Sequence, residues 1–189
     1  LMSCLSSGCG VLDQIANLLA GLTTFPLLIR HAALTEKAQA TPAGSLGALW
    51  LPFFAGEGLT QNSNPFGVLC GLTSKHTDSG LLYRAAIESQ VQLLRIGYSR
   101  MDAPPIEQFS VYGGGSKNPV IVQTIADVFN ATVRRPKNAS EASTAGAALI
   151  AGYAVLRSGG YEGDFEDFVE ERVDLTEPVH PQREHAAVY

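Results

Sequence analysis

The chain has 189 residues, of which 46% are hydrophobic and 16% charged, a composition typical of one globular domain with a large core. Its formal net charge of −5 argues against nucleic acid or an anionic membrane surface as the main partner. Cys4, Cys9 and Cys70 lack metal-ligand spacing and fit a protein with reduced cysteines in the cytoplasm. The apolar run 145–156 is shorter than the ~20 residues of a membrane span, and the start at Leu1 shows no signal-peptide pattern.

Hydrophobic periodicity predicts helices and strands in alternation along the chain. Helices are expected over 5–19, 25–37, 77–100, 119–129 and 141–157. Strands are expected over 49–54, 67–72, 109–112 and 131–134. Thr77 or Asp78 is the candidate N-cap of the third helix. An amphipathic surface helix should cover the acidic stretch 162–171, and another should begin near Pro181. This alternation indicates an α/β domain.

Three further patterns have structural rather than catalytic interpretations. The helix over 141–157 has a face of small residues that predicts tight packing in the core: Ala142, Ala145, Gly146, Ala148, Ala151 and Gly152. The cluster Arg134, Arg135 and Lys137 is interpreted as a solvated strand end. Among the histidines, His31 and His76 are isolated and interpreted as structural or surface residues, and the spacing of His180 and His185 predicts no metal site.

The strongest local pattern is the stretch from Tyr112 to Pro119, where three glycines follow a strand that should be buried and precede a helix. Asn118 can cap that helix, and Pro119 suits its first position because proline lacks an N–H group. Bare backbone at the glycines and free N–H groups at the helix start would favour a negatively charged ligand. The stretch is neither a Walker loop nor a G-x-G-x-x-G fingerprint. A tight strand-to-helix turn and a ligand-binding loop therefore both remain open.

Together, four segments resemble the C-terminal domain of the FGGY carbohydrate kinases, the family of xylulokinase, gluconokinase, glycerol kinase and ribulokinase. The match lies in the opening segment 1–13, in 51–57 with 67–73, in 84–88, and in 113–118 with 126–128 and 141–148. Residues 84–88 resemble the family's "RA-x-x-EG", and 113–118 resemble "GGGAKS". The family's "GERTP" appears here as residues 56–60 without its arginine and proline, so a contact through that arginine cannot be assumed.

The resemblance implies a ribonuclease H-like fold of the actin-like ATPase and sugar kinase class, incomplete at its N-terminal strands and thus with an exposed sheet edge. Residues 1–189 would be the ATP-binding domain, cut at both ends, with ATP and Mg²⁺ as cofactors. Nucleotide contacts would come from Gly8, Gly113, Gly114, Gly115 and Asn118. Gly114 would line the adenosine pocket through its backbone and Asn118 would approach the adenine, a role that can coexist with helix capping. No catalytic residue or metal ligand is expected in the chain, because the family's general-base aspartate lies upstream.

The implied reaction is transfer of the γ-phosphoryl group of ATP to a sugar hydroxyl, with a ketopentose such as xylulose as the expected substrate. The sugar would bind mainly to the upstream domain, so the chain alone should be inactive. No nucleic acid or membrane partner is expected, and a homodimer is compatible with the resemblance. The altered segment 56–60 keeps a second hypothesis open, a non-catalytic remnant that acts as an interaction or regulatory module. An actin- or chaperone-like ATPase is a third.

Overall fold

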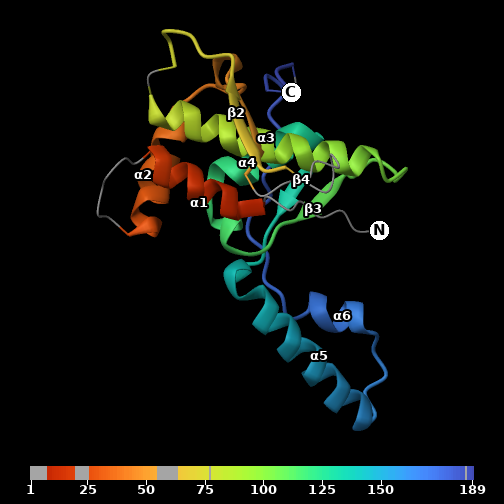
Figure 1. The fold of residues 1–189 in the computed structure, drawn as a ribbon. Helices are drawn as coiled ribbons and strands as arrows, with labels where there is room; N and C mark the ends of the chain where they lie inside the picture. The colour runs from red at the N-terminus through yellow and green to blue at the C-terminus, as the bar shows by residue number, and fades with distance from the viewer. Residues whose placement is uncertain (1–7, 20–25, 55–63, 77, 186) are drawn as a thin grey trace.

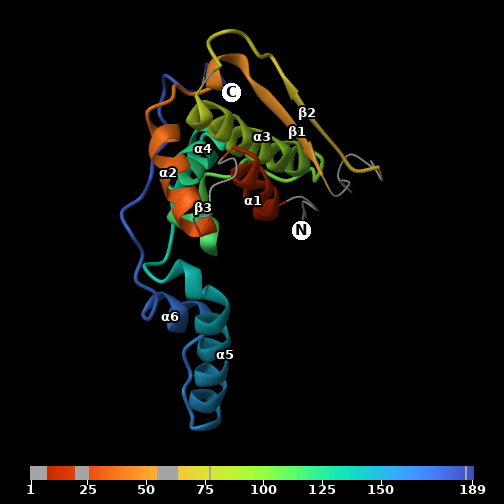
Figure 2. The ribbon, with the colours of Figure 1, turned by 60° about the vertical axis from the view of Figure 1, so that its left-hand side comes forward.

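The computed structural model describes residues 8–19, 26–54, 64–76, 78–185 and 187–189. These residues form a body of helices with two small sheets, and a pair of helices projects from this body as an arm (Figures 1 and 2). The element types predicted from periodicity are found in the body. The start of the predicted first helix, 5–7, lies outside the described residues.

The body is organised around α3 (Ser79–Ser99), which runs through its centre (Figure 1). Three helices pack against α3, as does strand β1 (Leu49–Phe53): α1 (Gly8–Leu19), α2 (Leu27–Gln39) and α4 (Pro119–Phe129). Because α3 has neighbours on several sides, most of its residues from Gly80 to Val91 are buried. It is the scaffold on which the other elements are placed.

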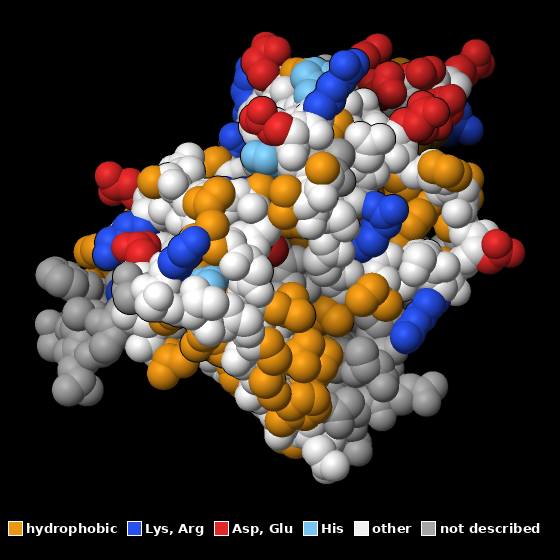
Figure 3. All heavy atoms as spheres, turned by 90° about the horizontal axis from the view of Figure 1, so that it is seen from above, with side chains coloured by type: hydrophobic (Ala, Val, Ile, Leu, Met, Phe, Trp, Pro, Cys, Tyr) orange, Lys and Arg blue, Asp and Glu red, His pale blue; other side chains and the backbone are white. Residues whose placement is uncertain are grey.

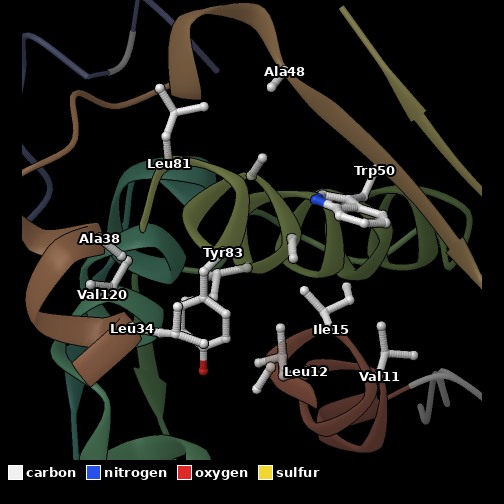
Figure 4. Close-up of a cluster of buried hydrophobic side chains, with 14 residues drawn as sticks. Val11, Leu12, Ile15, Leu34, Ala38, Ala48, Trp50, Leu81, Tyr83 and Val120 are labelled. Atoms are coloured by element: carbon white, nitrogen blue, oxygen red, sulfur yellow. The ribbon is translucent and has the colours of Figure 1, made fainter. Parts of the chain in front are cut away.

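Buried hydrophobic side chains fill the space between α3 and its neighbours (Figure 4). Ile15 of α1 and Tyr83 of α3 are almost inaccessible, with 0% and 1% of their surface exposed. Trp50 of β1 is buried as well, and its ring Nε1 donates a hydrogen bond to the Leu82 carbonyl oxygen at 2.9 Å. A second cluster joins α4 to the end of α3 and to the parallel strands: Val91, Val122, Ile125, Ala126, Val128 and Val133.

The two sheets have two strands each. β1 pairs antiparallel with β2 (Phe66–Cys70), and β3 (Gln108–Ser110) pairs parallel with β4 (Thr132–Arg134). Within the described part of the chain, β3 has a partner on one edge only, as expected for an incomplete sheet. The strand predicted over 109–112 is found at 108–110 and is not buried: none of its three residues is buried, and Tyr112, which lies beyond its end, is 53% exposed.

Hydrophobic side chains gather in one area of the face seen from above, whereas acidic side chains cluster on the opposite side of that view (Figure 3). The hairpin contributes exposed hydrophobic residues to the surface: Leu49, Phe66 and Val68 are each about 40% exposed or more. Within the described residues, no helix combines the length and the apolar character that crossing a bilayer requires.

The start of α3 crosses α2 so closely that it requires a glycine. Asp78 caps the helix, its Oδ1 accepting a hydrogen bond from the Gly80 N–H at 2.6 Å, as predicted. A Cβ atom on Gly80 would lie 2.3 Å from Lys37 Cβ and 2.6 Å from the Lys37 carbonyl carbon. Since the second contact is with backbone, a larger side chain would push the two helices apart.

We therefore expect Gly80→Ala to lower the free energy of unfolding by about 1–3 kcal/mol, measured by urea denaturation, because overpacking strains the crossing. The matched control is Gly10→Ala in α1, where a Cβ atom would meet no heavy atom within 4 Å. This control should leave stability unchanged or raise it, since alanine is the better helix former. Equal effects of the two substitutions would contradict the explanation.

The arm consists of α5 (Ala142–Ser158) and α6 (Phe165–Glu170) (Figures 1 and 2). Aromatic side chains pack between the two helices: the ring centroids of Tyr153 in α5 and Phe168 in α6 are 5.4 Å apart. The prediction that the small-residue face of α5 packs in a core is wrong for this chain: no residue of α5 is buried. Its neighbours are α6 and the short 3-10 turn η3 (Ala139–Glu141), so its small-residue face meets no core element of the described body. The acidic stretch does form a short amphipathic helix, anchored by buried Phe168.

After α6 the chain returns to the body as an irregular segment. Val179 and Val133 exchange two backbone hydrogen bonds of 2.9 Å. The helix predicted near Pro181 is wrong, because the Gln182 N–H is bonded to Asp127 Oδ1 at 2.8 Å rather than within a helix. The segment ends at Tyr189, whose hydroxyl donates to Glu88 Oε1 of α3.

Candidate functional site

The three glycines between β3 and α4 differ in what the structure requires of them. Gly113 has a φ of +83°, a conformation that strongly favours glycine. A Cβ atom on Gly115 would lie 3.2 Å from Cys9 Sγ, so this position needs a small residue. Gly114 has an ordinary φ and open space where a Cβ atom would be. No packing contact therefore explains Gly114, and its bare backbone is open to a ligand.

The first turn of α1 lies against the glycine loop, although the two are more than a hundred positions apart in the sequence. Gly8 is the first residue of α1, and the thiol of the next residue, Cys9, approaches Gly115. Burial, and then the Asp13 carboxylate, raise the pKa of that thiol. The start of α1 and the glycine loop, which the sequence analysis combined only by resemblance, therefore approach each other at Cys9 and Gly115.

Asn118 follows the 3-10 turn η2 (Gly114–Lys117) and caps α4 as predicted. Its Oδ1 accepts hydrogen bonds from the N–H groups of Val120 at 3.0 Å and Ile121 at 3.4 Å, while its backbone carbonyl accepts from Val122 N. The expectation of free N–H groups at this helix start is therefore wrong, since Asn118 pairs with them and Pro119 has none. An anion here would be attracted by the helix dipole, the loop backbone and nearby positive charge rather than by free N–H groups in the first turn.

Asn118 uses the other end of its carboxamide as well. Its Nδ2 donates to Thr35 Oγ1 of α2 at 2.8 Å. These two contacts, oxygen to α4 and nitrogen to α2, define which way the amide group points. One N–H of the carboxamide is thereby engaged by Thr35, and the side chain also hydrogen-bonds to the Tyr83 hydroxyl.

Two contacts from later in the chain support the glycine loop. The Gly113 N–H donates to the Ala139 carbonyl oxygen at 2.8 Å, and the Arg135 guanidinium donates to the Ser116 carbonyl oxygen. Ser116 is 1% exposed, and its hydroxyl donates to the Gly113 carbonyl at 2.6 Å. The interpretation of Arg134, Arg135 and Lys137 as a solvated cluster is thus wrong for Arg135, which places a positive charge beside the loop.

The motif residues Arg84 and Glu88 lie away from the loop and form a buried ion pair. Arg84 Nε donates to Glu88 Oε1 at 2.8 Å, and both side chains are 8% exposed. Glu88 also accepts hydrogen bonds from Gly44 N at 3.0 Å and Ser45 Oγ at 2.7 Å. This pair joins α3 to the segment after α2, and its surroundings give it a structural role.

A cavity of about 350 Å³ lies along β3 and the second halves of α3 and α4. It is lined mainly by Leu94, Tyr98, Phe109, Val111 and Phe129. Asn118 lies at the opposite end of α4, but Tyr112, which directly precedes Gly113, also lines the cavity. It does not include Gly8 or any of the three glycines of the loop.

The histidines take part in local hydrogen bonds. His76 Nδ1 accepts from the Thr73 N–H at 2.8 Å, and His185 Nδ1 lies 2.7 Å from Asp127 Oδ2. His31 lies within hydrogen-bond distance of both Asp13 and Tyr83, two contacts that its isolated position in the sequence did not predict. In the part of the chain that the structure describes, no three His, Cys, Asp or Glu side chains gather as metal ligands.

Comparison with known proteins decides the family. A model of the C-terminal domain of the FGGY family of carbohydrate kinases matches residues 14–155. The chain belongs to this family. Among curated relatives, glycerol kinase from Acinetobacter baylyi is 33% identical over 129 residues, 66% of this chain and 26% of that protein. Xylulose kinase from Haemophilus influenzae is 34% identical over 146 residues, 76% of this chain and 28% of that protein.

Solved structures of FGGY sugar kinases have the same arrangement of elements. The xylulose kinase from Rhodospirillum rubrum superposes with a TM-score of 0.77 at 29% identity, covering 99% of this chain and 36% of that one. Plasmodium falciparum glycerol kinase with ADP gives a TM-score of 0.69 at 21% identity, covering 94% of this chain and 33% of that one. The chain therefore spans about a quarter to a third of the length of these FGGY kinases. The segment 56–60, where the sequence departs from the family pattern, lies outside the described residues.

Proposed function

We propose that this chain is the ATP-binding part of a carbohydrate kinase that transfers the γ-phosphoryl group of ATP to a sugar hydroxyl. The observation that best supports this proposal is that the start of α1 lies against the glycine loop. In that loop, Gly114 has open space and no packing contact that requires a glycine. Membership of a carbohydrate kinase family supports the reaction class. The nucleotide contacts that we propose are Gly8, Gly113, Gly114, Gly115 and Asn118, and the charge of Arg135 beside Ser116 would favour an anionic ligand.

We further propose a ribonuclease H-like fold for the complete domain and a ketopentose such as xylulose as the substrate. The similarity to the Rhodospirillum rubrum xylulose kinase over 99% of this chain supports this choice, although glycerol kinases are relatives of comparable identity. The chain covers only 26–36% of its relatives, and we assign it neither the general base nor the sugar site. We therefore expect the purified chain to have no sugar-dependent ATPase or kinase activity.

The two cofactors differ in how well the described residues suit them. The glycine loop suits a nucleotide, because its backbone is accessible at Gly114. For Mg²⁺, the described residues provide no set of three ligands, so we assign the ion to the phosphates of ATP and derive no step through it. In this proposal the contribution of the chain to catalysis is to bind and orient the nucleotide.

Substitution of Asn118 separates its capping role from a role in nucleotide binding. Asn118→Ser retains an oxygen that caps α4 but removes the carboxamide, whereas Asn118→Ala removes both. We expect Asn118→Ser to preserve stability within about 0.5 kcal/mol and to weaken ADP binding about tenfold, while Asn118→Ala also destabilises by about 1 kcal/mol. Urea denaturation and chemical-shift titration of the chain with ADP measure the two effects.

For the wild-type chain, ADP should bind weakly, with a dissociation constant of about 1 mM or above, and its largest shifts should fall in residues 113–118 and 8–10. If both Asn118 variants bind ADP like the wild type, Asn118 serves only as a cap. If the wild-type chain binds no nucleotide, the proposed function fails and the non-catalytic alternative is favoured.

A further inference from the structure

A chain of polar side chains runs through the helical body to Asn118. His31 of α2 contacts Asp13 of α1 through Nε2, at 2.9 Å from Oδ1, and Tyr83 of α3 through Nδ1, at 2.7 Å from the hydroxyl oxygen. One turn further along α2, Thr35 accepts the hydrogen bond from Asn118 Nδ2 at 2.8 Å. Residues from three helices, α1, α2 and α3, and the cap of α4 thus form one polar network.

The Tyr83 hydroxyl connects the two halves of this chain. Tyr83 is 1% exposed, and Figure 4 shows its ring directed from α3 between Leu34 of α2 and Leu12 of α1, with the oxygen at its tip. Burial raises the pKa of Tyr83 to about 12, whereas hydrogen bonds from the side chains of Thr35 and Asn118 act in the opposite direction. The same hydroxyl therefore faces His31 on one side and the Thr35–Asn118 pair on the other.

One arrangement of hydrogens satisfies every member of this chain. A carboxylate only accepts, so the His31 Nε2–H donates to Asp13, which leaves Nδ1 to accept from the Tyr83 hydroxyl. The Tyr83 oxygen can then accept from the Thr35 hydroxyl and from the Asn118 amide, whose other hydrogen bonds to the Thr35 oxygen. Along this chain, each group donates a hydrogen bond to the next group on the way from Asn118 to Asp13. The alternative orientation of the Asn118 amide would set its NH₂ group against the N–H groups of α4.

We propose that Thr35 and Tyr83 are positioning residues that hold the Asn118 carboxamide for nucleotide binding. This inference rests on the proposed function, since it concerns the same site. The Asn118 oxygen is engaged by Val120 and Ile121, and its NH₂ group by the Thr35 and Tyr83 hydroxyls, so the plane of the carboxamide is fixed beside the glycine loop, where its face can pack against a nucleotide base. Without either hydroxyl the carboxamide loses one of the contacts that fix its plane, and ordering it again on binding costs affinity.

The test is a double-mutant cycle read out by ADP titration of the full chain. Thr35→Val and Tyr83→Phe each remove one hydroxyl and should raise the ADP dissociation constant about 3- to 10-fold. In an Asn118→Ser background, neither substitution should weaken binding further, because both act through the carboxamide. Thr35→Ser, which keeps the hydroxyl, should bind ADP like the wild type.

A control variant removes a comparable hydroxyl far from the loop. Tyr153→Phe deletes the hydrogen bond to the Gly163 carbonyl in the arm and should leave ADP binding unchanged. If Thr35→Val and Tyr83→Phe bind ADP like the wild type, or if their effects persist in the Asn118→Ser background, the positioning role is overturned while the proposed function stands. If the wild-type chain itself binds no ADP, the proposed function fails.

Discussion

Replacing Arg84 with methionine is expected to lower the free energy of unfolding by about 3–5 kcal/mol, because it leaves the buried Glu88 carboxylate without its charge partner. Arg84 Nε lies 2.8 Å from Glu88 Oε1, and its Nη1 donates to the carbonyl oxygens of Ala38 and Thr41. Burial acts to lower the pKa of Arg84, but the hydrogen bonds to Glu88 and Tyr189 outweigh it, and the pKa is raised. The guanidinium therefore remains charged in the folded protein.

Urea denaturation of three variants tests this explanation. The double variant Arg84→Met/Glu88→Gln removes both charges and should be more stable than Arg84→Met alone, because no uncompensated buried charge remains. Arg157→Met on the exposed arm is the control and should change stability by less than about 0.5 kcal/mol. If the double variant is less stable than Arg84→Met, the cost lies in lost packing rather than in the unpaired carboxylate.

Replacing Asp127 with alanine is expected to destabilise the protein by about 3 kcal/mol and to release the C-terminal segment. The Asp127 side chain is 0% exposed and accepts hydrogen bonds from Gln123 Nε2 and Gln182 N, both at 2.8 Å, with His185 Nδ1 at 2.7 Å. Alanine leaves these donors without their acceptor, one of them a backbone N–H. The segment would then keep the contacts of His180 with Gln123 and Thr132 and that of the Tyr189 hydroxyl with Glu88, and the stretch around Arg183 between them would be released.

Limited proteolysis measures this release directly. Trypsin should cleave after Arg183 several-fold faster in Asp127→Ala than in the wild type, since the local opening becomes less costly. Asp167→Asn removes an exposed carboxylate from α6 and should leave both the cleavage rate and stability unchanged. Wild-type cleavage kinetics in Asp127→Ala would show that other contacts hold the segment.

Features that depend on neighbours in the sequence were predictable. The N-caps Asp78 and Asn118 follow from side-chain oxygens that reach N–H groups two and three positions later. The helices of the body follow from apolar spacing, since each presents one face to α3. The family could also be recognised from the order of its short motifs, which the match over residues 14–155 confirms.

The errors occur where a sequence pattern has more than one structural meaning. Small residues on α5 permit close packing but do not supply a partner, and here the helix lies in an exposed arm. The pattern near Pro181 suits a helix, yet Asp127 and Val133 bind the backbone of that segment instead. Local propensity is a few tenths of a kcal/mol per residue, so a buried acceptor can override it.

The sequence by itself determined the family, the order of the body elements and the capped helix after the glycine loop, because these depend on short-range spacing. Only the tertiary structure decided what surrounds the loop: Thr35 beside Asn118, Cys9 against Gly115 and Arg135 on Ser116. These residues are 19 to 106 positions apart, and no periodicity relates them. They meet because α1, α2 and α4 pack on one helix, α3, whose burial sets their relative positions.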